Sequence, residues 1–274
     1  MTRMPAPSAN ARLRRIASRQ NPLLKDARRA FSTSGHEDGL CGIEGVRLVE
    51  EAIRSGIRFR AVLFSETGAE RSSRLLSQLG QKIETVVMED EIFRSCVATD
   101  SPQGVAALLQ LKPASLDTLL SGTNPLLLVA AGLQDPGNLG TMIRSAEAFG
   151  CSGLVLTERT VSVLNPKSLR ASAGSAFRLP WTQSIAKDTI ATLRDRGFRL
   201  FGTSSHQGTP LPQADFSGPV AIFIGNEGAG LPQPIERQMD DLVVIPHSSQ
   251  VESLNAGIAA SLVLYEASRQ RPKV

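Results

Sequence analysis

The sequence predicts an α/β fold in two domains, with a mainly parallel sheet in the larger one. Short apolar runs rich in β-forming residues alternate with amphipathic stretches along most of the chain. Residues 112–124, which hold two prolines, a serine and a glycine, interrupt this alternation and predict a linker. The length of 274 residues exceeds that of one average domain and favours two.

The smaller predicted domain spans residues 12–111 and follows a tail, residues 1–11, whose Pro, Ala and Ser predict disorder. A helical charge pattern at 12–31 is interrupted by Pro22 and leads into a polar loop. The alternation that follows predicts a small α/β layer. Its expected elements are an apolar stretch 40–44, helix 46–55, strand 60–65, helix 71–79, strand 83–88, helix 90–96 and strand 104–111.

Residues 125–274 form the larger predicted domain, where the alternation is strongest. Its pattern favours a mainly parallel sheet that is covered by helices on both faces, because strands alternate with helices. The expected elements are strand 126–133, helix 139–149, strand 153–157, a polar segment to 178, helix 185–196, strands 198–203, 220–224 and 242–245, and a last helix 254–269.

Positive charge is concentrated at the N-terminus. Residues 1–30 hold eight Arg or Lys and one Asp, a formal charge of +7, which leaves −3 for the rest of a chain whose net charge is +4. Such a segment suits a polyanion, since each neutralised phosphate releases counterions. A solvated helix face and an Arg-rich mitochondrial presequence remain the alternatives.

The sequence predicts neither a membrane span nor a metal site. No stretch approaches the roughly 18–20 uninterrupted apolar residues that cross a bilayer, and no secretory pattern opens the chain, so we expect a cytoplasmic protein. Cys41, Cys96 and Cys151 are odd in number and far apart, with no Cys-x-x-Cys motif or paired histidines nearby. Neither a disulfide framework nor bound zinc is therefore expected.

Three segments carry most of the functional information: Asp135–Phe149, Ile224–Pro232 and Ile245–Asn255. In the second and third, an apolar strand ends in a turn that bears polar side chains, and the first follows such a strand closely, which is how strand-supported loops hold ligands. The sequence Gly225-Asn-Glu-Gly-Ala-Gly230 matches neither the dinucleotide pattern nor the phosphate loop. The sequence therefore does not favour an enzyme that binds a nicotinamide cofactor or ATP.

The three segments, in this order, closely resemble the motifs of SpoU/TrmH-type RNA ribose 2'-O-methyltransferases of the SPOUT class. The resemblance covers roughly residues 124–270, and a weaker one to the family's N-terminal RNA-binding module covers roughly 12–111. It implies a C-terminal trefoil knot, which general topology rules make improbable; we follow the resemblance. It also implies S-adenosylmethionine as cofactor, RNA as partner, and a homodimer formed by the C-terminal domains.

The resemblance assigns site residues one by one. Arg144 would hold the ribose or an adjacent phosphate, and Asn138, which could cap its helix, would fix it together with Glu227. The other residues of the implied site are Ser253 and Asn255, which would complete the pocket, and Thr203, Gly225, Asn226, Ile245 and Leu254, which would hold the cofactor. Ser253 as a plain helix cap is the structural alternative.

Arg144 is a poor general base. The guanidinium pKa exceeds about 12, so the protonated group offers no acceptor lone pair, and orientation with charge stabilisation is the expected role. The sequence departs from the family at His247, where methionine commonly follows Ile-Pro, and a catalytic histidine there is not expected. With only one Trp and one Tyr, electrostatics and shape should dominate RNA binding.

Five residues are the candidate RNA contacts: Arg14, Arg15, Arg19, Lys25 and Arg170. Lys167 and Arg178 could add to them. The apolar residues of the last helix could form the dimer surface or belong to the core. Ribosomal RNA is the favoured substrate, with transfer RNA, a non-catalytic RNA-binding or ribosome-assembly role, and a Rossmann-type metabolite enzyme as alternatives.

Overall fold

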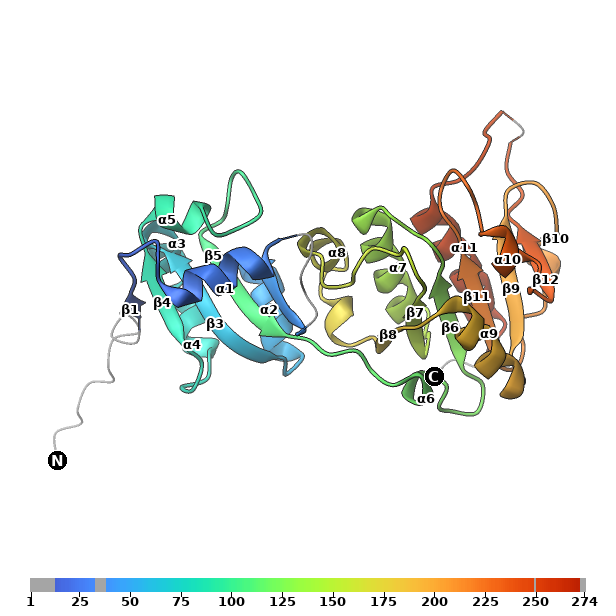
Figure 1. Ribbon diagram of the computed structural model, residues 1–274, viewed down its shortest axis with the longest axis horizontal. Coiled ribbons are helices and arrows are strands. Elements are labelled where there is room, and N and C mark those ends of the chain that lie inside the picture. The colour runs from blue at the N-terminus through green and yellow to red at the C-terminus, as the bar shows by residue number, and fades with distance from the viewer. Residues whose placement is uncertain (1–12, 33–37, 249, 272–274) are drawn as a thin grey trace. The chain divides into compact units, whose positions relative to one another are not determined.

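The computed structural model describes residues 13–32, 38–248 and 250–271 of the chain (Figure 1). The described residues form two compact units. Unit 1 holds those up to Lys112 together with Leu164–Pro166, and unit 2 holds Pro113–Val163 and the residues from Lys167 onward. The predicted tail at 1–11 lies outside the described residues.

Unit 1 contains a five-stranded mixed sheet in the order β1-β4-β3-β5-β2. Strand β5 is antiparallel to both β2 and β3, whereas β4 is parallel to β3 and to β1. The strands are β1 (Arg14–Arg15), β2 (Leu40–Glu44), β3 (Arg58–Ser65), β4 (Thr85–Met88) and β5 (Val105–Gln110).

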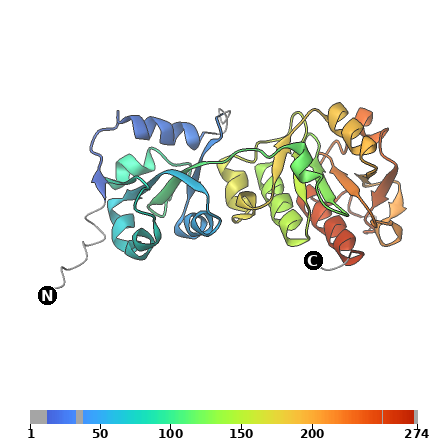
Figure 2. The same cartoon turned by 90° about the horizontal axis from the view of Figure 1, so that it is seen from below.

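Helix α1 covers one face of this sheet and α2 and α4 the other (Figure 2). The helical pattern expected across residues 12–31 is wrong at its start. Residues 14–15 form an edge strand and the helix begins only at Pro22, because Asn21 caps it by accepting a hydrogen bond from the Leu23 amide. The helices are α1 (Pro22–Ala30), α2 (Val46–Arg54), α3 (Glu66–Arg71), α4 (Ser73–Gln78) and α5 (Asp90–Arg94).

Unit 2 is built on a seven-stranded sheet in the order β10-β12-β9-β11-β6-β7-β8, in which every pairing is parallel. The predicted α/β fold with a mainly parallel sheet is therefore confirmed. The strands are β6 (Leu126–Ala130), β7 (Gly153–Leu156), β8 (Trp181–Gln183), β9 (Arg199–Ser204), β10 (Thr209–Pro210), β11 (Val220–Ile224) and β12 (Asp241–Val244). Sequence analysis missed the short strands β8 and β10.

Helices cover both faces of the larger sheet (Figure 2). Helix α9 packs Ile190 and Leu193 against one face, where the short α6 adds Leu119. Helices α7 and α11 lie side by side on the other face, joined by a 2.6 Å hydrogen bond between the Ser145 and Ser261 hydroxyls. The helices are α6 (Leu116–Leu119), α7 (Pro136–Ala148), α8 (Pro166–Ala171), α9 (Ala186–Asp195), α10 (Gln233–Glu236) and α11 (Ala256–Arg269).

Parallel strands bring all their carboxyl ends to one edge of the sheet. The loops after β6, β9, β11 and β12 therefore leave the sheet on the same side, although the ends of β6 and β12 are 114 residues apart in sequence. In the part of the chain that the structure describes, no helix is both long and apolar enough to span a bilayer. Cys41 and Cys96 are buried thiols, whereas Cys151 is half-buried.

Candidate functional site

A cavity of about 440 Å³ opens at the carboxyl edge of the larger sheet. Three loops line it, those after β9, β11 and β12, together with the first turn of α11. The lining residues are Thr203–His206, Ile224–Gly228, Gly230, Ile245, His247, Glu252–Leu254, Ala256 and Ala259. All five predicted cofactor contacts lie on this wall, as do Glu227 and Ser253.

The loop after β11 is closed on itself. Asn226 and Gly230 pair through two main-chain hydrogen bonds of 3.0 and 2.9 Å, and the Asn226 side-chain oxygen accepts from the Gly228 amide. A Cβ at Gly225 would lie 2.2 Å from the Gly230 carbonyl, so only glycine fits there. The loop therefore presents a preformed wall to the cavity.

Asp135, and not Asn138, caps helix α7. The Asp135 carboxylate accepts a 2.7 Å hydrogen bond from the Asn138 amide, and Pro136 takes the first helical position. A Cβ at Gly137 would stand 2.8 Å from this carboxylate, so the glycine makes room for the cap. The predicted capping role of Asn138 is wrong because Asn138 lies inside the first turn.

The side chain of Asn138 makes a different contact, since its amide nitrogen donates a hydrogen bond to the Glu227 carboxylate. This bond joins the start of α7 to the loop after β11, across 89 residues of sequence. The structure thus brings together two of the five predicted catalytic residues. It also brings the first segment to the wall of the cavity, because Glu227 is part of that wall.

The Arg144 side chain is exposed on α7 and makes no hydrogen bond or ion pair with any residue that the structure describes. It is not among the residues that line the cavity. Two turns earlier on the same helix, Asn138 holds Glu227. An arginine with all its donors available beside such a site can receive a planar anionic or hydroxyl-bearing group.

The loop after β12 ends at the N-terminus of α11, which Asn255 caps. Its side-chain oxygen accepts from the amides of Gly257, at 3.0 Å, and Ile258, at 3.2 Å. Ser253 is therefore not the cap; it is an exposed lining residue. The Nδ1 atom of His247 lies 2.6 Å from the Ile245 carbonyl oxygen, which places the imidazole on the cavity wall.

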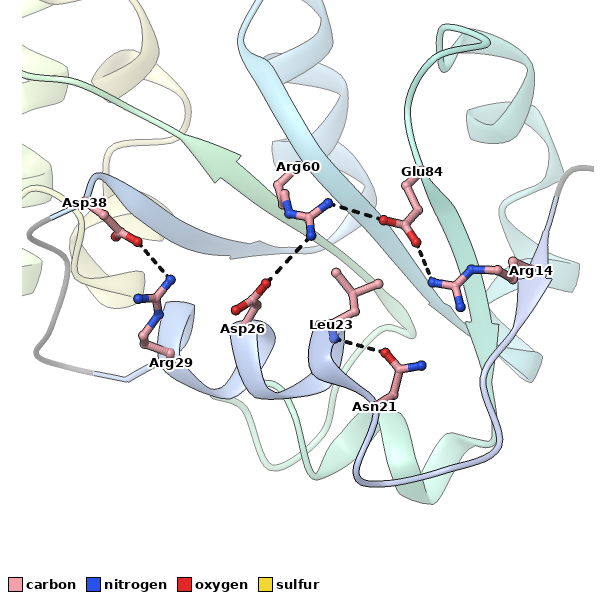
Figure 3. A network of polar contacts seen from close by, with 8 residues as sticks. All are labelled: Arg14, Asn21, Leu23, Asp26, Arg29, Asp38, Arg60 and Glu84. Carbon is pink, nitrogen blue, oxygen red and sulfur yellow. Dashed lines mark hydrogen bonds and ion pairs between the residues drawn. The ribbon is translucent and has the colours of Figure 1, made fainter.

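The predicted RNA contacts in unit 1 are mostly ion-paired. Arg14 and Arg60 share the carboxylate of Glu84, and Arg60 also lies 3.9 Å from Asp26 on α1 (Figure 3). Arg15 pairs with Glu66 and Arg19 with Glu91, at 2.6 Å for the latter. These pairs hold the N-terminal segment against α3, α5 and the residue that precedes β4.

The remaining predicted RNA contacts are exposed. Lys25 lies on the outer side of α1 with no ion pair to another described residue, and Arg170 lies at the end of α8. Arg178 donates two hydrogen bonds to Glu147, at 2.5 and 3.0 Å, and these lower the pKa of that carboxyl. These bonds hold the Arg178 side chain against α7.

The cavity suits a nucleoside-sized cofactor. Its volume lies within the range of about 300–1,000 Å³ that ligand pockets occupy. The side chains of Thr203, Ser204 and Ser253 supply hydroxyls, while Ile245 and Leu254 supply apolar surface. Hydroxyls beside aliphatic walls match a sugar and a base, so these residues fit S-adenosylmethionine.

Five lining residues lie outside the three predicted segments and were not assigned to the site from the sequence: Ser204, Ser205, His206, Ala256 and Ala259. Ser204 directly follows the predicted Thr203, and Ala256 directly follows Asn255, so their sequence neighbours indicated their place. Among the described residues, no group of three or more His, Cys, Asp or Glu side chains is arranged to hold a metal ion.

Two family models match the chain. Residues 125–265 match the SpoU rRNA Methylase family, and residues 35–107 match an MRM3-like substrate binding domain. An uncharacterized tRNA/rRNA methyltransferase of Synechocystis sp. is 36% identical over 93% of this chain and 94% of its own. The 23S rRNA (guanosine(2553)-2'-O)-methyltransferase RlmP of Bacillus subtilis is 31% identical over 92% and 98%.

Solved structures agree with these matches. The SpoU methyltransferase AviRb from Streptomyces viridochromogenes, in complex with the cofactor AdoMet, superposes with a TM-score of 0.81 at 29% identity, over 92% of this chain and 98% of its own. The AdoMet-bound rRNA methyltransferase from Sinorhizobium meliloti gives 0.83 at 26% identity, over 96% and 100%. Family match, sequence identity and fold converge on one conclusion: the chain belongs to the SpoU rRNA methylase family.

Proposed function

We propose that the protein transfers a methyl group from S-adenosylmethionine to a ribose 2'-hydroxyl of RNA, with ribosomal RNA as the substrate. The main observation that supports this proposal is the hydrogen bond between Asn138 and Glu227 at the wall of a cofactor-sized cavity. Family membership and the AdoMet-bound relatives support the cofactor, and the relative RlmP supports the 2'-hydroxyl acceptor and the ribosomal substrate.

The cofactor supplies an activated methyl group, and the residues of this chain position the acceptor. Thr203, Gly225, Asn226, Ile245 and Leu254 would hold the cofactor. Arg144 would grip the ribose or a neighbouring phosphate and stabilise negative charge as the hydroxyl loses its proton. Of the other proposed catalytic residues, Asn138 and Glu227 would fix Arg144 and the loop after β11, and Ser253 and Asn255 would complete the pocket.

Positioning should supply more of the rate than proton removal. Correct orientation can contribute about 7–11 kcal/mol, whereas general base catalysis contributes about 10²–10⁴-fold in rate. In this proposal Arg144 acts through its hydrogen-bond donors and its positive charge.

Unit 1 would bind the RNA outside the target nucleotide, and its match to a substrate binding domain supports this role. In this division, residues 12–111 form the RNA-binding domain, 112–124 the linker and 125–274 the methyltransferase domain. Arg14, Arg15, Arg19, Lys25 and Arg170 would contact phosphates. The ion pairs of Arg14, Arg15 and Arg19 are exposed, so phosphates could compete with their carboxylates.

The C-terminal segments would form a trefoil knot. Strand β12 lies on one side of β9 and β11, yet the helix that follows it, α11, packs against α7, the helix that follows β6. This return from β12 to α7 supports the proposed knot, in which the chain would cross the loops after β9 and β11. The end of α11 is held there by Arg271, which donates hydrogen bonds to the Asn124, Phe216 and Gly218 carbonyls.

A homodimer would form on the exposed side of α7 and α11. Ile258, Leu262 and Tyr265 stand 53%, 40% and 54% exposed at spacings of four and three residues, which places them on one stripe of α11. Tyr265 packs edge-on against Phe149, with ring centroids 5.7 Å apart. Ala256 and Val263 are buried and belong to the core.

Calorimetry with S-adenosylmethionine tests the cofactor assignment. The wild-type protein should bind with one site per chain, and Leu254→Glu, which places a charge on the apolar wall, should abolish binding. Leu242→Glu, on strand β12 outside the cavity lining, serves as the control for a general effect of the substitution. A wild-type protein that binds RNA but not the cofactor would favour a non-catalytic RNA-binding role.

A further inference from the structure

The loop after β7 is bonded along its length to the loop after β6. Main-chain hydrogen bonds run from Thr157 to the Ala130 carbonyl, at 3.0 Å, and from Val161 to the Leu133 carbonyl, at 2.8 Å. Between them, the Thr160 hydroxyl donates to the Ala130 carbonyl and accepts from the Gly132 amide, both at 3.0 Å. Thr160 supplies the side-chain bonds that tie these two loops together.

The segment that Thr160 holds sets the direction of the chain toward α7. Gly132 has a φ of +72°, a left-handed conformation that turns the chain as it leaves β6. Asp135 caps α7 three residues later, and Asn138 then reaches Glu227. A shift at Gly132 would therefore be passed to the start of α7.

The neighbouring Arg159 is also left-handed, with a φ of +63° although it is not a glycine. Such a conformation persists only where the surroundings hold it. The Thr160 amide bonds to the Thr157 carbonyl at 3.2 Å, and its hydroxyl anchors the turn to the neighbouring loop. The turn at residues 157–160 thus holds the Thr160 hydroxyl in a fixed position.

We propose that Thr160 is a positioning residue for the methyl transfer. It orients the turn at Gly132 and so places α7, with Asn138 and Arg144, against the loop that carries Glu227. This inference rests on the proposed function. Thr160 is absent from the cavity lining, so it acts on the acceptor side of the site and not on cofactor binding.

Three variants test this role. Thr160→Val keeps the shape but leaves the Gly132 amide without its acceptor, whereas Thr160→Ser keeps the hydroxyl. Thr192→Val is the matched control, because it removes a half-buried hydroxyl that donates to the Asp188 carbonyl on α9, at 2.9 Å. The readouts are kcat, the Kd for S-adenosylmethionine and the thermal midpoint.

We expect Thr160→Val to lower kcat by about 10- to 100-fold, as for a small misplacement of reacting groups. Cofactor Kd should stay within about twofold, and Thr160→Ser and Thr192→Val should stay close to wild type in kcat. Wild-type kcat in Thr160→Val overturns the inference. A parallel loss of cofactor binding and folding also overturns it, since that reports a general structural defect.

Amide hydrogen exchange decides the inference independently of activity. Thr160→Val should speed exchange in residues 131–138 and in the loop 225–230, while Thr160→Ser and Thr192→Val should not. Unchanged exchange in those segments rejects the positioning role. If the wild-type protein shows no methyl transfer, the proposed function fails, whereas the exchange result still tells whether Thr160 orients α7.

Discussion

The side-chain amide of Asn138 donates a hydrogen bond to the carboxylate of Glu227, and this single contact joins the first and second sequence segments of the site. Glu227 faces the cavity, while Asn138 lies in the first turn of the helix that carries Arg144. In the proposed mechanism, this contact couples the loop that holds the cofactor to the helix that positions the acceptor.

Reversing the polarity of this hydrogen bond tests its importance. Asn138→Asp should lower kcat/KM by about 10- to 100-fold, because two carboxylates would face each other and a bond to a charged group is worth about 1.5–3 kcal/mol. Adding Glu227→Gln lets the new amide donate to the new carboxylate. Steady-state kinetics should show recovery in the double variant relative to Asn138→Asp. Additive losses would mean that the two residues act separately.

Arg144→Lys should lower kcat by about 10²-fold or more, because lysine keeps the charge but loses the planar pair of donors. Since Arg144 does not line the cavity, calorimetry should give an unchanged Kd for S-adenosylmethionine. Arg237→Lys, another exposed arginine of unit 2, is the control. Full activity of Arg144→Lys at saturating RNA would contradict the proposal that Arg144 binds the acceptor through two donors.

Asn255→Ala should destabilise the protein by about 0.5–2 kcal/mol, because it removes the cap that holds two amides of α11. Ser253→Ala should leave stability unchanged, since Ser253 is exposed and caps nothing, yet should reduce activity as part of the cavity wall. Denaturant unfolding and kinetics separate the two effects. Equal unfolding midpoints for both variants would refute the assignment of the cap.

Glu84→Gln should strengthen RNA binding, because it releases both Arg14 and Arg60 from their shared carboxylate. The slope of log affinity against log salt should steepen by about one unit for each phosphate newly contacted. Glu50→Gln is the control: it removes the same charge from unit 1, and among the described residues the Glu50 carboxylate accepts a side-chain hydrogen bond from Gln78 alone. If both variants bind RNA alike at several salt concentrations, Arg14 and Arg60 do not contact phosphates.

Ile258→Glu should convert the proposed dimer into monomers, because a carboxylate on the α11 stripe would be buried in the interface. Ile185→Glu is the matched control, as Ile185 is 55% exposed next to α9, on the opposite face of the sheet. Sedimentation should separate the two variants. A monomeric wild-type protein would contradict the proposal directly.

Local sequence pattern was enough to predict the long elements. Continuous apolar runs such as Leu126–Ala130 and Val220–Ile224 are strands because parallel strands bury both faces. The strand Arg14–Arg15 could not be recognised, since two arginines form a strand only when β4 offers an edge. The ion pair between Arg14 and Glu84 likewise depends on residues 70 positions apart.

The site could be predicted where a short motif determines its own local geometry. Gly225 and Asn226 close a loop within six residues, so the sequence signals the turn. The cap of α7 was misassigned although Asp135 directly before Pro136 is a strong start signal. The hydrogen bond between Asn138 and Glu227, and those of the Thr160 hydroxyl, depend on the order of strands in the sheet. A local sequence pattern does not reveal this order.

Methyl transfer to a ribose 2'-hydroxyl is measured most directly by alkaline hydrolysis of RNA after incubation with the protein and radiolabelled S-adenosylmethionine. A methylated 2'-oxygen cannot attack the adjacent phosphate, so a modified site survives as a dinucleotide. We predict label in alkali-resistant dinucleotides from ribosomal RNA, and none with Arg144→Ala. Label in mononucleotides, which marks methylation of a base, or no label at all, would contradict the account.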